Sequence, residues 1–155
     1  VPADCAIFGE KDFQQLAVLR QMVGDLDLTI SLIGHPIVRE SDGLAFSSRN
    51  HYLSPKERAI APLLYQTLGK SAAEILAGAD ILQSLEKAKC QLLAGGFTKI
   101  DYLDLRDATS LARALTAKAN DRLFVAAWLR ETRLIDNCAI DSHPANSGHD
   151  ASGLA

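Results

Sequence analysis

The stretch that decides the fold is CAIFGEKDFQQLAVLRQMVGDLDLTISLIG, residues 5–34. Residues 4–8 predict a short buried strand, and residues 11–23 predict a helix that Gly24 ends. One apolar stripe on that helix comprises Phe13, Leu16, Leu19 and Val23. Residues 28–33 predict a second strand. A strand, a helix and a strand with short links predict a βαβ unit, with parallel strands and a right-handed crossover.

The two predicted strands are too few for a complete parallel sheet. Parallel sheets are covered on both faces and contain more than two strands, so we expect the missing strands to lie outside this chain. The N-terminus points the same way, because Val1 stands in place of an initiator methionine and a strand follows almost at once. No basic start precedes a long apolar run, as it would in a signal peptide. We therefore expect the chain to be part of a longer protein.

A polar loop at residues 35–52 precedes the next predicted helix. The sequence Ser-Pro-x-Glu at residues 54–57 is typical of a capping box with proline at the first helical position. We expect Pro62 to kink this helix, because proline lacks a backbone N–H. Gly78 is expected to close the segment.

The rest of the chain predicts one more helix and then strands. Asp80 is placed to cap the helix, and Gly95-Gly96 ends it. Three predicted strands follow, at residues 100–105, 122–129 and 134–140. The short turn at residues 130–133 predicts an antiparallel hairpin from the last two. Helices followed by strands are typical of a small α+β domain. The tail at residues 141–155 has almost no apolar content and is expected to be disordered.

Composition excludes several classes of protein. The chain has 155 residues, of which 48% are hydrophobic and 23% charged, values typical of a globular protein. A net charge of −3 gives no basic surface for nucleic acid. No apolar run reaches the roughly 20 residues that cross a bilayer. The chain has three cysteines, Cys5, Cys90 and Cys138. Their spacing fits neither a disulfide framework nor a zinc site. We expect Cys5 to be a buried, inert thiol, and the protein to be cytoplasmic.

The segment Gly9-Glu10-Lys11-Asp12 lies where the first strand turns into the first helix. Glycine lets the backbone approach a ligand, and the first helical turn offers unpaired N–H groups with partial positive charge. Lys11 adds a full charge with three hydrogen-bond donors. These features suit a phosphate or a carboxylate. A solvated turn with a local ion pair explains the same residues.

A second polar segment, residues 47–50, has the sequence Ser-Ser-Arg-Asn. Two hydroxyls and a guanidinium in one loop can surround phosphate oxygens, with the guanidinium binding bidentately. One alternative is a surface loop turned by Asn50. Another is that Arg49 forms a salt bridge within the chain, because Glu40 and Asp42 lie nearby in the sequence.

The remaining polar candidates are weaker. Gln14 and Gln15 begin a helix, where an amide can recognise a hydroxyl or carboxylate, although most helical glutamines face water. We interpret His35 and His51 as structural. We interpret His143 and His149 as part of a solvated tail, and weak metal binding is the alternative for these two. The phosphate-binding motifs GxxxxGK[ST] and GxGxxG are absent from the sequence, and no Ser/His/Asp or Cys/His arrangement stands out. Local chemistry alone therefore predicts only a possible anion site.

Three stretches together resemble the pantothenate synthetase (pantoate–β-alanine ligase) family. In chain order they are FGEKDFQQL at residues 8–16, RESDGLAFSSRNHYLSPKERAIAPLLYQTL at residues 39–68, and VAAWLRETRLIDN at residues 125–137. The resemblance extends from about residue 4 to Asn137. It implies an enzyme that joins pantoate to β-alanine with ATP and Mg²⁺, through a pantoyl-adenylate, and releases AMP and pyrophosphate.

The resemblance also implies roles for individual residues. Gln15 matches the glutamine that binds pantoate. The positions that match the ATP-binding residues of the family are Gly9, Glu10, Lys11, Asp12, Val38, Phe46, Ser47, Ser48 and Arg49. Among these, we expect Lys11 to contact the phosphates and the backbone of Val38 to contact the adenine. The segment Ser47-Ser48-Arg49 matches the KMSKS loop of class I aminoacyl-tRNA synthetases. No metal ligand and no general base is assigned.

The HIGH-like histidines of the family have no match here, so we expect this chain to be the C-terminal half of the enzyme and inactive alone. The fold expected from the resemblance is α/β, with the remainder of a Rossmann-like, HIGH-superfamily nucleotidyltransferase domain at residues 1–37 and an α+β lid domain at residues 38–140. Expected partners are the missing N-terminal half and a second copy in a homo-oligomer. The alternatives are a related adenylate-forming nucleotidyltransferase and a non-catalytic folding or association module.

Overall fold

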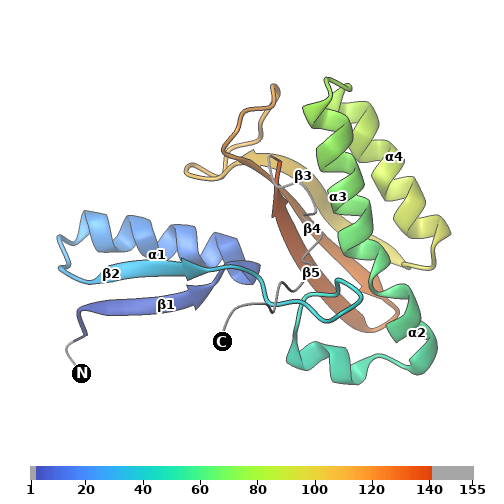
Figure 1. The fold of residues 1–155 in the computed structure, drawn as a ribbon, viewed down its shortest axis with the longest axis horizontal. Coiled ribbons are helices and arrows are strands. Elements are labelled where there is room, and N and C mark those ends of the chain that lie inside the picture. Colours follow the sequence, from blue (N-terminus) through green and yellow to red (C-terminus); the bar gives the residue numbers. More distant parts are fainter. Residues whose placement is uncertain (1–2, 141–155) are drawn as a thin grey trace, which may run out of the picture.

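A computed structural model describes residues 3–140 and divides their strands between two sheets (Figure 1). The first sheet pairs β1 (Cys5–Gly9) with β2 (Ser31–His35) in parallel. The short 3-10 helix η1 (Glu10–Asp12) and the helix α1 (Phe13–Asp25) connect the two strands. The predicted βαβ unit is therefore present, with β2 three residues later than expected from the sequence at its start.

The helix α1 covers one face of this parallel pair, as Figure 1 shows. Two predictions in this region are wrong. Gly24 lies inside α1, because the backbone turns away only at Asp27, which has a positive φ of 49°. Cys5 is exposed rather than buried. It shares with Ile7 the strand face that points away from α1. Ile7 keeps 66% of its surface exposed, because nothing within residues 3–140 covers that face.

Three helices follow the loop after β2: α2 (Pro55–Ile60), α3 (Leu63–Leu76) and α4 (Ile81–Ala94). The predicted capping box is present, since the Ser54 hydroxyl accepts from the Glu57 N–H while the Glu57 carboxylate accepts from the Ser54 N–H. The predicted kink is a complete break, because Pro62 separates α2 from α3.

The second sheet is antiparallel, in the order β3 (Lys99–Asp107), β4 (Asp121–Leu129) and β5 (Thr132–Ala139). All three predicted strands are present, and β5 begins earlier than predicted because the turn needs only Arg130 and Glu131. Arg130 takes a positive φ of 48°, which suits a two-residue hairpin turn. Within the described residues β5 is an edge strand, with one neighbour in the sheet.

The main core lies between this antiparallel sheet and the helices α3 and α4, which Figure 1 places on one side of it. Its largest fully buried side chains include Leu64, Leu68, Leu92, Leu103, Leu123 and Leu129. No helix within residues 3–140 is long and apolar enough to cross a membrane. The predictions for the tail, including those for His143 and His149, fall outside the described residues.

Candidate functional site

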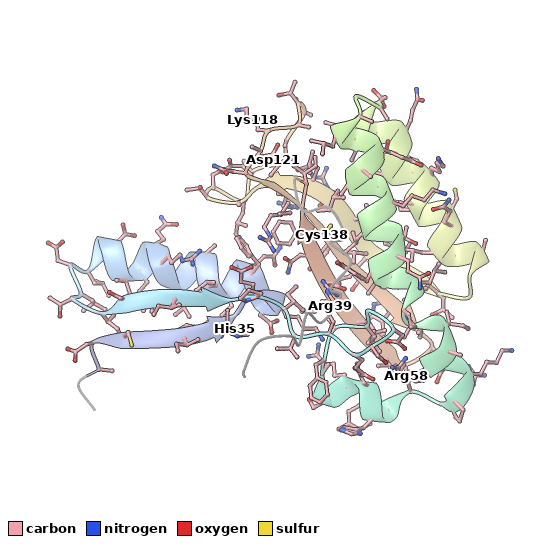
Figure 2. All side chains as sticks on the ribbon, viewed as in Figure 1. His35, Arg39, Arg58, Lys118, Asp121 and Cys138 are labelled. Carbon is pink, nitrogen blue, oxygen red and sulfur yellow. The ribbon has the colours of Figure 1, made fainter. Side chains whose placement is uncertain are left out.

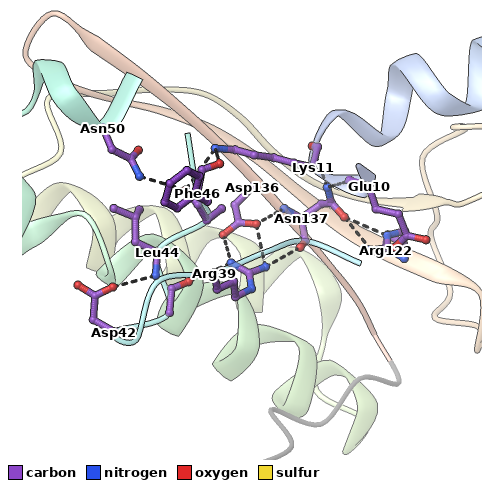
Figure 3. Close-up of polar contacts among 12 residues, drawn as sticks. Glu10, Lys11, Arg39, Asp42, Leu44, Phe46, Asn50, Arg122, Asp136 and Asn137 are labelled. Atoms are coloured by element: carbon purple, nitrogen blue, oxygen red, sulfur yellow. Dashed lines mark hydrogen bonds and ion pairs between the residues drawn. The ribbon is translucent and has the colours of Figure 1, made fainter. Parts of the chain in front are cut away.

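Lys11 connects the first polar segment to the residues that come directly before the second. It lies in η1, directly after β1, and its Nζ donates to the carbonyl oxygens of Phe46, at 3.2 Å, and Ala45, at 3.4 Å (Figure 3). Segments that are more than thirty residues apart in the sequence therefore meet at one ammonium group. Two of its three N–H bonds face these carbonyls, which leaves one for a further acceptor.

The charge of Lys11 is held in an unusual environment. Burial lowers the pKa of Lys11, while the carboxylates of Asp136 and Asp12 act in the opposite direction. The cations Arg49 and Arg39 lie close enough to lower this pKa further. The cations Lys11, Arg39 and Arg49 thus lie close to one another, with Asp136 paired to Arg39 and Asp12 beside Lys11.

The loop before residue 47 is a small hairpin. The N–H of Phe46 donates to the carbonyl of Val38 at 2.9 Å, and the N–H of Glu40 donates to the carbonyl of Leu44 at 2.8 Å. Gly43 closes the turn with a φ of 93°, a conformation that L side chains rarely adopt. Val38 and Phe46 stay 59% and 66% exposed at the open end of this hairpin, so both remain available to a ligand.

The Ser-Ser-Arg-Asn segment forms a 3-10 helix, η2 (Ser48–Tyr52), in which the Ser47 hydroxyl accepts from the Arg49 N–H at 3.2 Å. Ser48 and Arg49 are not buried. Asn50 faces inward and donates to the Glu40 carboxylate at 2.8 Å and to the Ala45 carbonyl at 3.2 Å. Asn50 therefore ties η2 to the hairpin.

The suggested salt bridge of Arg49 is not found among residues 3–140. Glu40 and Asp42 instead bind Arg58 of α2, at 2.6 and 2.5 Å. Hydrogen bonds from Arg58 lower the pKa of both carboxyl groups. Because α2 already supplies the cation for these acids, the guanidinium of Arg49 does not have to.

Gly9 presents bare backbone at this site. A Cβ added there would meet no heavy atom within 4 Å, so the space beside it is open. Gly9 has an ordinary extended φ of −69°, and its value therefore lies in close approach rather than in conformation. Asp12, the last residue of η1, follows it after two residues and is not buried.

Gln14 and Gln15 lie on the first turn of α1 and line a hollow of about 210 Å³ together with Lys11 and Asp12. The apolar wall of this hollow is formed by Phe13, Tyr102, Phe124 and Ile135. The hollow therefore places Gln15, which is predicted to bind pantoate, beside Lys11 and Asp12 of the first polar segment. The two histidines of this region, His35 and His51, are exposed.

The sequence analysis missed two residues of β5, Asp136 and Asn137, that support the candidate site. The Arg39 guanidinium binds both carboxylate oxygens of Asp136, at 2.7 and 3.0 Å. Asn137 donates to the carbonyls of Glu10 and Lys11, at 2.8 and 3.1 Å (Figure 3). The available signal was two consecutive polar residues inside the otherwise apolar run at residues 134–140, since buried polar side chains in proteins nearly always have partners.

Arg122 completes this support from β4. It donates to the Asn137 side-chain oxygen through Nη2 at 2.8 Å and through Nε at 3.1 Å, and its guanidinium lies over the Phe13 ring, 4.4 Å from the centroid. Figure 2 shows Arg39 near the junction between the two sheets, well away from Lys118 and Asp121 at the other end of the antiparallel sheet. Within residues 3–140, no group of three acidic, histidine or cysteine side chains is placed to hold a metal ion.

Comparison with solved structures shows the same fold in known enzymes. Pantothenate synthetase from Thermus thermophilus superposes with a TM-score of 0.83 at 41% identity, covering 88% of this chain and 50% of that one. A pantoate–β-alanine ligase from Francisella tularensis, described as complexed with beta-gamma ATP and β-alanine, superposes with a TM-score of 0.64 at 29% identity. That match covers 90% of this chain and 44% of the other.

Comparison of sequences agrees with the fold. The pantothenate synthetase of Rhodospirillum rubrum is 53% identical over 141 residues, which are 90% of this chain and 50% of that protein. The pantothenate synthetase of Pseudomonas savastanoi pv. phaseolicola is 54% identical over 138 residues, 88% of this chain and 48% of that protein. The chain therefore spans about half the length of these relatives. Because the family model described as pantoate-beta-alanine ligase also matches residues 1–139, this chain belongs to the pantoate–β-alanine ligase family.

Proposed function

We propose that this chain supplies the C-terminal half of an enzyme that condenses pantoate with β-alanine at the expense of ATP, through a pantoyl-adenylate, releasing AMP and pyrophosphate. The observation that carries this proposal is the contact between Lys11 and the carbonyls of Ala45 and Phe46. It brings the first polar segment beside Phe46, the residue at which the second ATP-contacting stretch of the resemblance begins. A surface turn with only a local ion pair has no need of this long-range contact.

The first half-reaction builds negative charge. When a carboxylate attacks the α-phosphorus of ATP, charge accumulates on the phosphoryl oxygens and on the departing pyrophosphate. Lys11, with one N–H beyond the two carbonyl contacts, and Arg49 are the cations that stabilise this charge. The hydroxyls of Ser47 and Ser48 donate to the same oxygens. The backbone of Gly9, Glu10 and Asp12 lies beside the phosphate oxygens.

Substrate orientation falls to the neighbouring residues. Gln15, which lines the same hollow as Lys11, holds pantoate in line with the α-phosphorus and acts by proximity. The backbone of Val38 and the start of the loop at Phe46 contact the adenine, since both residues are exposed at the open end of the hairpin. Mg²⁺ in such enzymes is held mainly by nucleotide phosphates and water, so it needs few ligands from the protein. When bound, it neutralises part of the phosphate charge.

The other half of the site belongs to the part of the enzyme that this chain does not contain. We assign residues 1–37 to the end of a Rossmann-like nucleotide-binding domain and residues 38–140 to a lid domain. The two-stranded parallel sheet with its open outer face supports this assignment. We expect the complete enzyme to be a cytoplasmic homo-oligomer and the isolated chain not to make pantothenate.

Calorimetric titration of MgATP into the purified chain tests the proposal. The wild-type chain is expected to bind, and Lys11→Ala is expected to lose the binding. Lys70→Ala is the matched control, because Lys70 is a lysine of α3, far from the site in the sequence. A folded wild-type chain that binds no MgATP, or equal binding by Lys11→Ala, contradicts the assignment of the phosphate site to this half.

A second candidate is a non-catalytic folding or association module. It is favoured by the exposed apolar side chains on and around the parallel pair, among them Ile7, Val18, Leu26 and Ile33. Such surfaces normally pack against a partner. Sedimentation of the chain as a stable oligomer, together with no MgATP binding, is the result that favours this candidate. A monomer that binds MgATP excludes it.

A further inference from the structure

Two consecutive residues of β5, Asp136 and Asn137, are almost completely buried and yet polar. They are 2% and 1% exposed. Successive side chains of a strand point to opposite faces of the sheet, so one of them faces the helices and the other faces the parallel unit. Leu134 and Cys138, which share the face of Asp136, belong to the core beneath α3 and α4. We call Asp136 and Asn137 the β5 pair.

The first member of the β5 pair holds the hairpin at residues 38–46. Asp136 receives two hydrogen bonds from the Arg39 guanidinium, and Arg39 also donates to the Gly43 carbonyl at 3.0 Å. The same guanidinium lies over the Tyr65 ring, 3.5 Å from its centroid. Arg39 is thus fixed on three sides, and the turn of the hairpin at Gly43 is fixed with it.

The second member holds the segment that carries Lys11. The side-chain oxygen of Asn137 is occupied by Arg122, which leaves its NH₂ group to donate to the carbonyls of Glu10 and Lys11. Arg122 thereby determines which way the amide of Asn137 faces. The two contacts are to backbone, so they fix the position of η1 whatever its side chains do.

We propose that the β5 pair consists of positioning residues that set the distance between the two proposed phosphate-binding segments. Asp136 and Asn137 are adjacent on one strand. Asn137 holds the segment of Lys11, and Asp136 holds the hairpin to which Asn50 ties the second segment. Neither side chain reaches the surface, so neither is a ligand of the nucleotide. This inference rests on the proposed phosphate role of Lys11 and assigns its placement to the antiparallel sheet.

A merely stabilising role predicts something different. If Asn137 only strengthened the fold, its loss would resemble the loss of any buried side chain of the same sheet. If Asn137 positions Lys11, its loss affects the affinity for the triphosphate and leaves the affinity for adenosine unchanged. A displacement of a positioned group by about 1 Å can change rates or binding by up to about a hundredfold.

The test compares Asn137→Ala with Val125→Ala in the full 155-residue chain. Val125 is buried on the helix side of β4, so its truncation weakens the same sheet without touching η1. Two kinds of measurement are made on each variant. Calorimetry gives the dissociation constants of MgATP and of adenosine, and amide hydrogen exchange is followed in residues 9–13 and 45–50. Asn137→Ala is expected to weaken MgATP binding about tenfold, within the range produced by a displaced group, and to speed exchange in residues 9–13. Val125→Ala is expected to do neither.

The outcomes separate the two proposals. Equal exchange of residues 9–13 in Asn137→Ala and Val125→Ala overturns the positioning role. A wild-type chain that binds no MgATP contradicts the proposed function, and the exchange comparison then decides the positioning role alone. If Asn137→Ala does not fold, Asn137→Asp replaces it in the exchange measurement. That variant keeps an oxygen for Arg122 and removes the donor to the two carbonyls, so unchanged exchange there overturns the positioning role as well.

Discussion

The Arg39 guanidinium and the Asp136 carboxylate form a two-point ion pair, with N–O distances of 2.7 and 3.0 Å, across ninety-seven positions of the chain. The Asp136 side chain is 2% exposed and that of Arg39 is 18% exposed. The pair joins a loop that follows the parallel sheet to an edge strand of the antiparallel sheet. The fold of the loop therefore depends on a strand that is made almost a hundred residues later.

Loss of one partner of this pair is expected to be costly. Arg39→Met leaves a buried carboxylate without its cation and should lower the free energy of unfolding by about 3 kcal/mol. Lys89→Ala, which removes the surface pair with Glu86, should lower it by about 0.5 kcal/mol or less. Urea unfolding followed by circular dichroism measures both. Equal losses in the two variants would show that the Arg39 pair acts as an ordinary surface pair.

The affinity for ATP is expected to fall as the pH rises. Burial lowers the pKa of Lys11 below the ordinary lysine value, so the ammonium loses its proton at a lower pH than an exposed lysine does. Phosphate binding needs the charged form, so affinity is full below the lowered pKa and is lost above it. Lys11→Arg keeps its charge at every accessible pH, and its binding should stay constant where that of the wild type declines. Titrations from neutral to alkaline pH measure the difference, and parallel profiles for the two proteins would contradict it.

The three thiols are expected to react in two classes. Burial, with a smaller contribution from Asp136, raises the pKa of Cys138 to about 12, whereas Cys5 and Cys90 are exposed. A thiol reacts as its thiolate, so iodoacetamide in mildly alkaline buffer should modify Cys5 and Cys90 quickly and Cys138 only after unfolding. Mass spectrometry of the native and the urea-treated chain gives the count. Rapid modification of Cys138 in the native chain would refute its burial.

Removal of the capping box of α2 is expected to have a moderate effect. Ser54→Ala takes away the acceptor for the Glu57 N–H and should cost about 1 kcal/mol of stability. Ser41→Ala is the control, because Ser41 is exposed in a loop, and such surface changes usually stay within about 0.5 kcal/mol. Thermal unfolding of both variants provides the measurement. A loss in Ser54→Ala no greater than in the control would mean that α2 does not depend on its cap.

Local signals in the sequence were sufficient for most elements. The capping box at residues 54–57 and the hairpin before Thr132 follow from short-range backbone chemistry, and both are present. At Pro62 the sequence predicted a kink, and the structure has a break between α2 and α3. The predicted end of α1 was wrong, because Gly24 lies within the last turn of that helix. The prediction that Cys5 is buried was wrong for a different reason. An apolar strand is buried only if something covers it, and within residues 3–140 the outer face of β1 is uncovered.

The sequence by itself also determined the candidate segments. Gly9 to Asp12 and Ser47 to Asn50 were recognisable from their residue types, and the three resembling stretches identified the family that the comparisons then established. The sequence did not determine which residues of the chain each segment contacts. The sequence suggested Arg49 as the partner of Glu40 and Asp42, but the fold gives that place to Arg58, which α2 brings within hydrogen-bond distance.

Only the tertiary structure decided how the two segments meet. Lys11 reaches the carbonyls of Ala45 and Phe46 because Asn137 holds η1 and Asp136, through Arg39, holds the hairpin at residues 38–46. These contacts join residues separated by up to 127 positions, and no local preference encodes such a distance. Helices, caps and turns depend on neighbours in the sequence, so the sequence determines them. A site assembled from several elements depends on how the sheets pack, and that is settled only when the whole chain has folded.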